Sequence, residues 1–225
     1  MLSHTASERE AGTTAFERVF DEMNVHRPCD TPSTPAVTPV TPRDFRCTDQ
    51  ANYRSSMPPT PDSDVLANPS VVRVVAALRV HGVRGAVRVL PDAARTARGA
   101  AAALGVDVAQ IANSLVFRAH PFDGDIRPLL VLTSGAHRVD TAKLADLVGL
   151  DKISTADADF VRRRTGFAIG GVPPLAHLEP PMTVVDVSLS RYGTIWAAAG
   201  HPHTVFPTSY DELLRLTGGT PAEVA

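Results

Sequence analysis

Two apolar segments in the middle of the chain, SLVFR at residues 114–118 and PLLVLT at residues 128–133, decide the fold class. A polar loop at residues 120–127 joins them, and a connection of this length favours two neighbouring antiparallel strands. Outside this pair, further strands are predicted at residues 86–90, 182–187, 194–198 and 204–206.

Helix signals flank the predicted strands. Asn68 and Pro69 begin a helix that Gly82 ends, because Asn is a common cap and Pro is tolerated in the first turn. A short helical turn at residues 108–113 leads into the first central strand. Four further helices are predicted at residues 96–104, 140–147, 157–164 and 209–216. This alternation is typical of an α+β fold and lacks βαβ regularity.

Composition divides the chain into three parts. With 225 residues and 44% hydrophobic residues, it can bury a substantial core. Residues 1–64 are rich in Pro and Thr and short of apolar runs, so we expect a disordered arm there, followed by one domain at 65–220 and a tail at 221–225. Within the arm, residues 14–25 have a helical apolar spacing that fits either a frayed helix or a short docking helix.

Charge and cysteine content narrow the function classes. The net charge of −2 gives no overall attraction to nucleic acid, so the cluster at residues 162–164, three arginines, is either a solvated helix face or a local contact for RNA. Cys29 and Cys47 are too few for a disulfide scaffold and suggest a reducing compartment. Neither a cofactor motif nor a long apolar run is found, and we expect a soluble, cytoplasmic protein without a cofactor.

The segment TGFAIGGVPP at residues 165–174 places two glycines beside two prolines. The glycines remove side chains from one side of a turn, and the prolines fix the backbone on the other side. Such a loop offers amide N–H groups to a carbonyl or a ribose, although taken alone it also fits a tight connection.

Four segments together resemble the YbaK/EbsC family of aminoacyl-tRNA deacylase domains, which also occur inserted in bacterial prolyl-tRNA synthetases. They are QIANSLVF at 110–117, LTSGAHRVDTAKL at 132–144, TGFAIGGVPP at 165–174 and GHPHTVF at 200–206. The resemblance covers about residues 66–219. It implies a mixed, mostly antiparallel, barrel-like sheet surrounded by helices, with a pocket for the 3′-terminal aminoacyl-adenosine of a mischarged tRNA.

The resemblance also implies site residues. The family's G-x-x-x-P loop maps onto residues 170–174, so Gly170 and Gly171 become catalytic candidates, and Val172 and Pro174 substrate-binding ones. Asn113 stands where the family usually has a catalytic lysine. It either orients substrate or water, leaves the domain able only to bind, or merely caps the start of a strand. Lys143 is a candidate for supplying the missing charge.

Polar residues near these motifs complete the candidate list. Ser114, Ser134, His137, Asp140, His201 and His203 are expected to contact substrate. A nucleophilic triad of Ser134, His137 and Asp140 is disfavoured, because the three crowd one loop and Asp140 also fits a helix cap. A zinc site formed by His201, His203 and His177 is disfavoured because no Cys or Glu cluster accompanies them, and simple strand-edge histidines remain an alternative. Trp196 is expected in the core.

The sequence therefore predicts a freestanding deacylase that acts in trans on a tRNA mischarged with a small amino acid such as Ala, Ser or Pro. The alternative is a catalytically weak or inactive module that binds tRNA 3′ ends or small ligands, as the absent lysine would allow. The expected partner is the acceptor end of an aminoacyl-tRNA, with a synthetase or an elongation factor as a further candidate. Neither a membrane nor a metal is expected.

Overall fold

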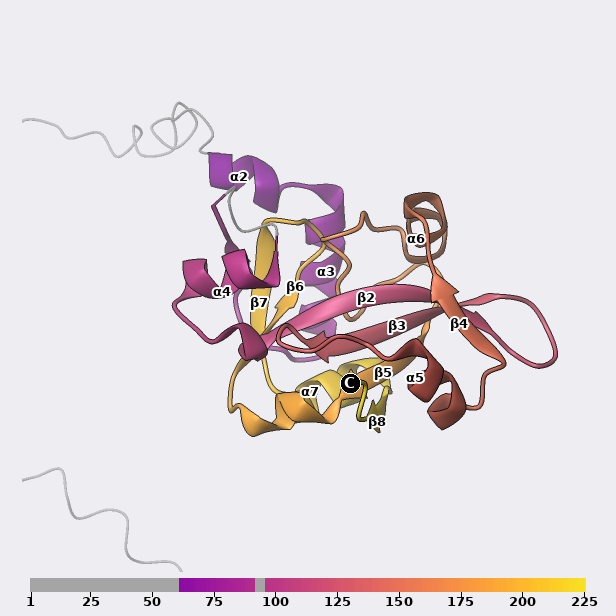
Figure 1. Cartoon of the computed structure of the whole chain (residues 1–225). Helices are drawn as coiled ribbons and strands as arrows, with labels where there is room; N and C mark the ends of the chain where they lie inside the picture. The colour runs from indigo at the N-terminus through magenta and orange to yellow at the C-terminus, as the bar shows by residue number, and fades with distance from the viewer. Residues whose placement is uncertain (1–60, 92–95) are drawn as a thin grey trace, which may run out of the picture. The chain divides into compact units, whose positions relative to one another are not determined.

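The computed structural model describes residues 61–91 and 96–225. Their centre is one eight-stranded sheet (Figure 1). In spatial order its strands are β1 (Arg88–Val89), β7 (Thr204–Thr208), β6 (Ile195–Ala198), β2 (Ile111–His120), β3 (Arg127–Ser134), β5 (Met182–Asp186) and β8 (Thr220–Ala222), with β4 (Lys152–Thr155) paired to β2 beside this path.

The sheet is mixed. The long pair β2 and β3 is antiparallel, as predicted from the two central segments, and Asn113 lies opposite Thr133 in it. Strand β4 also joins β2 in antiparallel fashion, and so do β6 with β7 and β1 with β7. Parallel pairs connect β2 with β6, β3 with β5, and β5 with β8. The predicted α+β class with a mostly antiparallel sheet is confirmed.

Six α-helices in the described residues surround the sheet, together with two short 3₁₀ helices, η1 (Val108–Gln110) and η2 (Val187–Arg191). The α-helices are α2 (Pro61–Leu66), α3 (Pro69–Val80), α4 (Ala97–Leu104), α5 (Thr141–Val148), α6 (Ala158–Thr165) and α7 (Tyr210–Thr217). Polar side chains cap five of these helices, four of them as predicted and Thr96 in addition. Asn68, Thr96, Asp140, Asp157 and Ser209 each accept a hydrogen bond from a backbone N–H of the helix that follows.

Buried side chains gather in three clusters. The largest includes Phe167 and Phe206 and joins the sheet to α3, α6 and α7. A second lies where α5 and β4 pack on β3 and β5. The third unites α4 with Ile111, Trp196 and Val205. Trp196 is 7% exposed, so its predicted place in a core is confirmed, and this third cluster forms one wall of the site described below.

The structure differs from the predicted elements at several points. Strand β1 is only two residues long, and β4 and β8 were not predicted. The helical turn before β2 ends at Gln110, so Asn113 is the third residue of the strand and does not cap its start. Helix α2 and strand β8 extend regular structure beyond the expected domain limits at 65 and 220, and Val224 in the expected tail is 1% exposed.

Two predictions for the arm, the helical spacing at 14–25 and the two cysteines, lie outside the described residues. Within residues 61–91 and 96–225, every helix is too short or too polar to cross a membrane.

Candidate functional site

The loop between α6 and β5 begins with a left-handed turn. Gly166 ends α6 with a φ of 78°, and Gly170 has a φ of 85°, a region that residues with a side chain rarely adopt. The amide of Gly171 donates to the carbonyl oxygen of Ala168 at 3.0 Å and closes the turn. Gly171 therefore contributes to the shape of the loop, and its N–H group already has a partner.

Gly171 also brings two distant loops into backbone contact. A Cβ atom at this position would lie 2.9 Å from the Cα of His201 and 3.0 Å from the nitrogen of Pro202. Such distances are too short for any side chain, so only glycine allows the 165–174 loop to rest on residues 201 and 202. Two of the four segments that resemble one family therefore meet at this contact. A third, which includes β2, joins them at the hollow described next.

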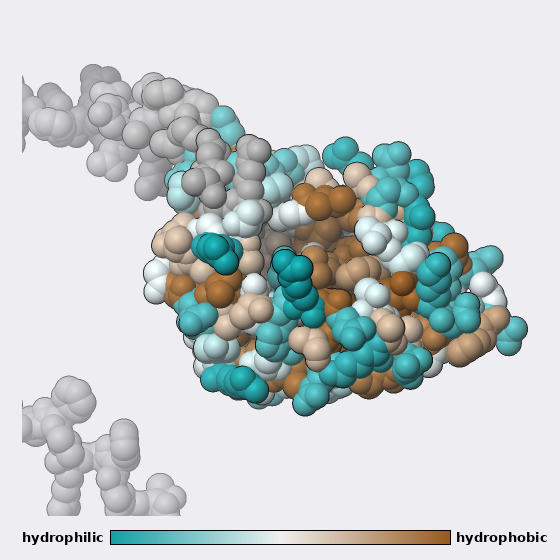
Figure 2. All heavy atoms as spheres, viewed as in Figure 1, coloured by the Kyte–Doolittle hydropathy of each residue, from teal (hydrophilic) through white to brown (hydrophobic). Residues whose placement is uncertain are grey.

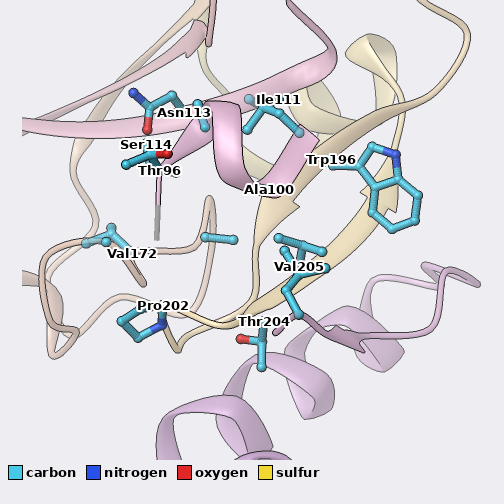
Figure 3. Close-up of a pocket in the computed structure, with 15 residues that line it drawn as sticks. Thr96, Ala100, Ile111, Asn113, Ser114, Val172, Trp196, Pro202, Thr204 and Val205 are labelled. Atoms are coloured by element: carbon cyan, nitrogen blue, oxygen red, sulfur yellow. The ribbon is translucent and has the colours of Figure 1, made fainter. Parts of the chain in front are cut away.

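A hollow opens where these segments meet (Figure 3). Its free volume is about 80 Å³. Asn113 and Ser114 reach it from β2, Gly170 and Val172 from the loop, and Pro202 from the opposite side. The remaining lining residues are Leu90, Thr96, Ala97, Ala100, Ile111, Ala112, Trp196, Ala198, Thr204 and Val205. Figure 2 shows hydrophobic surface gathered in a hollow near the middle of the face it displays, bordered by hydrophilic side chains.

Several hydrogen-bonding groups beside the hollow lack a protein partner. Within the described part of the chain, the amides of Gly170 and Val172 donate to no protein atom, and the side chain of Asn113 makes no hydrogen bond. The hydroxyl oxygen of Ser114 is buried and also unpartnered. Because a buried polar group without a partner is costly, this wall of the hollow is suited to a ligand that offers hydrogen bonds.

Two histidines are linked to Thr204, one of the residues that line the hollow. The backbone N–H of His201 donates to the hydroxyl of Thr204, a lining residue, at 3.1 Å. The Nδ1 atom of His201 accepts from the backbone N–H of His203 at 3.3 Å, and the two rings meet edge to face at 5.2 Å. Burial, and secondarily the neighbouring His203, lowers the pKa of His201. His201 is therefore uncharged at neutral pH and fixed in orientation.

A cationic side chain, Arg88, stacks on one of the lining residues. The guanidinium of Arg88 stacks on the ring of Trp196, with its central carbon 4.9 Å from the ring centre. Arg88 is exposed and does not line the hollow itself, whereas Trp196 does. Among the described residues, no group of three His, Cys, Asp or Glu side chains is arranged to hold a metal ion. The Nε2 atom of His177 is bonded to the carbonyl oxygen of Pro173 at 2.8 Å.

Four of the predicted site residues belong to a different region. It centres on Asp186, which is 1% exposed and accepts hydrogen bonds from the backbone N–H groups of Ser134 and Ser188. The Nδ1 atom of His137 lies 2.8 Å from the same carboxylate. Burial opposes the charge of Asp186, but the hydrogen bonds from Ser188 and Ser134 outweigh it, and the pKa of Asp186 is lowered.

The triad of Ser134, His137 and Asp140, which the sequence disfavoured, is not assembled in this region. The hydroxyl of Ser134 donates to the carbonyl oxygen of Ala109, and Asp140 caps α5 by accepting from the N–H groups of Ala142 and Lys143. The ammonium of Lys143 donates to the carbonyl oxygen of Ala225 at 2.6 Å. Lys143 is therefore held at the chain's last residues and does not line the hollow beside Asn113.

Sequence reasoning missed some residues of both regions. Asp186 was predicted only as part of a strand end, although an Asp after an apolar strand and before a Ser is a recognisable cap. Thr96 and Ala100 were predicted only as part of the helix at residues 96–104, and nothing local indicated that this helix would form a wall. Pro174 is buried next to the lining residues without lining the hollow itself.

Comparisons with known proteins place the chain in a family. Residues 91–216 match the family described as the aminoacyl-tRNA editing domain. The uncharacterized protein YwhH of Bacillus subtilis (strain 168) is 32% identical over 118 residues, which make up 52% of this chain and 72% of that protein.

Solved structures are also similar. The crystal structure of a candidate trans-editing enzyme for prolyl-tRNA synthetase is 42% identical with a TM-score of 0.64, covering 70% of this chain and 97% of that one. The hypothetical protein APE2540 is 26% identical with a TM-score of 0.61, covering 68% of this chain and 98% of that one. Because the family match spans more than half of the sequence, including β2 and the 165–174 loop, the chain belongs to the YbaK-like aminoacyl-tRNA editing domain family.

Proposed function

We propose that the protein is a freestanding deacylase that hydrolyses the ester bond of a tRNA mischarged with a small amino acid. The observation that carries this proposal is the hollow beside the 165–174 loop, which Gly170 and Val172, with unpartnered amides, line together with Asn113 and Ser114 in a member of an editing-domain family. The acceptor end of the aminoacyl-tRNA is the proposed partner. A synthetase or an elongation factor that delivers it would be a second one, and the cytoplasm would be the place of action.

The loop amides would stabilise the transition state. When water attacks the ester carbonyl, negative charge develops on its oxygen, and fixed N–H donors lower the barrier by about 3 kcal/mol each. The amides of Gly170 and Val172 are the donors available here, since the N–H of Gly171 already bonds to Ala168. We therefore assign the oxyanion contact to Gly170 and Val172, and a shaping role to Gly171.

Asn113 would orient the substrate or the attacking water. Its amide offers neutral hydrogen bonds, which are roughly half as strong as those from a charged lysine. The ribose hydroxyl next to the ester can assist the attack, so the proposal needs no side-chain base. Arg88, which stacks on the lining residue Trp196, would attract the phosphates that precede the terminal nucleoside.

The apolar wall would select small acyl groups. Ala100, Ile111 and Val205 leave limited space, while the unpartnered hydroxyl of Ser114 offers a polar contact. One additional methylene changes binding by only about 1–3 kcal/mol, so we expect graded preferences among Ala, Ser and Pro.

A second candidate is a module that binds aminoacylated 3′ ends without hydrolysing them. The specific observation in its favour is Asn113, a neutral residue at the position where related domains usually have a lysine. In this case the hollow and its donors would serve recognition only.

Incubation of the protein with a panel of mischarged tRNAs, followed by measurement of the released amino acid, separates the two candidates. The deacylase predicts multiple turnovers with at least one small amino acid, whereas binding without release across the panel supports the module. Asn113→Asp keeps the shape of the side chain and removes its N–H donor. We expect it to lower turnover by about tenfold or more, as for loss of a transition-state hydrogen bond, and an undiminished rate would contradict the role of Asn113.

A further inference from the structure

Three side chains form a stack that spans the base of the 165–174 loop. Arg73 of α3 lies over the ring of Phe167, with its guanidinium carbon 4.2 Å from the ring centre. His177 meets the same ring edge-on, at 5.8 Å between ring centres and an angle of 88°. Phe167 is 1% exposed and belongs to the main core cluster. The stack is therefore anchored in the core through Phe167, which contacts both other members.

Arg73 and His177 each bond to one end of the loop. Arg73 donates from Nη2 to the carbonyl oxygen of Gly166 at 3.2 Å. At the other end, the Nε2 atom of His177 is 2.8 Å from the carbonyl oxygen of Pro173. Since a carbonyl can only accept, His177 carries its proton on Nε2. The six residues between these two bonds include both glycines and Val172.

The backbone near the stack is adapted to it. A Cβ at Gly166 would lie 2.7 Å from Cγ of Leu178 and 2.9 Å from Nη2 of Arg73, so glycine makes room for both side chains. Ala176, directly before His177, has a φ of 66°, the only positive φ among the described residues other than glycine. A strained conformation of this kind persists where its surroundings hold it, and here the bond from His177 to Pro173 spans it.

We propose that Arg73 and His177 are positioning residues that hold the 165–174 loop in its productive shape, so that the amides of Gly170 and Val172 stay directed into the hollow. The inference rests on the proposed function only where it predicts rates. Neither residue lines the hollow, so each acts through the loop. A misplacement of about 1 Å at a reacting group can cost on the order of a hundredfold in rate, which is why the anchors of a donor loop matter.

A matched pair of variants separates the hydrogen bond from the ring. His177→Phe keeps a ring that packs against Phe167 and removes the donor, whereas His177→Gln keeps an N–H donor of similar reach and removes the ring. We expect His177→Phe to lower kcat by about tenfold or more while KM changes by less than about twofold, because the loss concerns the transition state. His177→Gln should recover most of kcat.

Hydrogen exchange provides a readout that needs no activity. In His177→Phe, amide exchange of a peptide covering residues 166–172 should accelerate about tenfold or more relative to the wild type, with β3 unchanged, and His177→Gln should slow it again. Arg73→Met preserves the aliphatic stem and removes the donor and the planar cation, so it should also accelerate amide exchange in the same peptide. This variant provides the test if His177→Phe does not fold.

Wild-type exchange in the loop of both His177→Phe and Arg73→Met would overturn the proposal. So would equal losses of kcat in His177→Phe and His177→Gln, because the bond to Pro173 would then be irrelevant. If the wild type releases no amino acid from any mischarged tRNA, the deacylase assignment fails, and the exchange comparison still decides whether the stack holds the loop.

Discussion

The hollow beside Gly170 and the cluster around Asp186 contain similar polar residues and differ in how their hydrogen bonds are used. At Asp186, the carboxylate accepts from Thr133, Ser134 and His137, which tie β3 and the loop after it to the end of β5, and from Ser188 in a bond that caps η2. At the hollow, the hydroxyl of Ser114 and the amide of Gly170 have no protein partner in the described residues. The comparison teaches that unused hydrogen-bonding capacity distinguishes a ligand site from a structural cluster of the same residue types.

The largest expected effect is on stability at Asp186. Asp186→Ala removes the acceptor of several buried bonds, and we expect a loss of about 3–5 kcal/mol in the free energy of unfolding. Chemical denaturation measures it, with the exposed Asp146→Ala as control at less than about 0.5 kcal/mol. Deacylation well below the melting temperature should persist. A fall in kcat without a fall in stability would mean that the two regions form one site.

The second prediction sharpens the contrast between a neutral and a charged group. Burial, assisted by Arg73 and opposed by the bond to Pro173, lowers the pKa of His177 from 6.5 to about 4. The unfolded chain therefore binds the proton first as pH falls, so stability is full above about pH 6.5 and declines toward pH 4, by about 2–3 kcal/mol at pH 4.5.

Denaturation of the wild type and of His177→Phe at pH 7.5 and pH 4.5 tests this, and the variant should lose most of the dependence. The pKa of Asp186 is lowered below 3.8, so its own contribution is lost only at more acidic pH. An unchanged pH dependence in His177→Phe would mean that His177 is not held neutral by its surroundings.

The third prediction concerns the left-handed glycines. Gly170→Ala adds a methyl group at a φ of 85° with its nearest contact 3.9 Å away, and Gly149→Ala adds one at a φ of 68° in open space at the end of α5. Both should lose about 1 kcal/mol of stability from backbone strain. Only Gly170→Ala should lower deacylation, by about ten- to a hundredfold, through displacement of the donor. Equal activity of the two variants would remove the loop amides from the mechanism.

The smallest effect compares two serines. Ser134 donates to Ala109 and accepts from the N–H of Ala136, so Ser134→Ala should cost about 1 kcal/mol. Ser114→Ala removes an unpartnered buried hydroxyl and should leave stability unchanged or raise it by up to about 1 kcal/mol. Opposite signs in thermal denaturation support the contrast, and a loss of stability in Ser114→Ala would show that its hydroxyl is bonded in the folded protein.

Much of the fold follows from local chemistry. The caps at Asn68, Asp140 and Asp157 set helix starts, because each side chain satisfies backbone donors a few residues away. Strand β8 contains Pro221 and has only three residues, so it depends on parallel pairing with β5 from a distant part of the chain. Strand β4 is short and polar, and only β2 makes it a strand. Such pairings need the whole fold.

The site was partly predictable for the same reason. Asn113, Ser114, Gly170 and Val172 could be grouped because their segments resemble one family, and the structure brings them to one hollow. His137 and Lys143 lie in a segment of the same resemblance, yet their partners are Asp186 and Ala225. The position of a loop residue within a motif does not reveal which distant part of the chain it will contact in the folded protein.

The contact at Gly171 has a consequence for engineering specificity. Because no side chain separates this residue from His201 and Pro202, the two loops that meet at the hollow pack backbone against backbone. We expect a methyl group here, as in Gly171→Ala, to push the two loops apart. The hollow would then admit bulkier acyl groups, although every lining side chain is unchanged. Under the proposed function, the range of accepted amino acids would therefore depend in part on the missing side chain of Gly171.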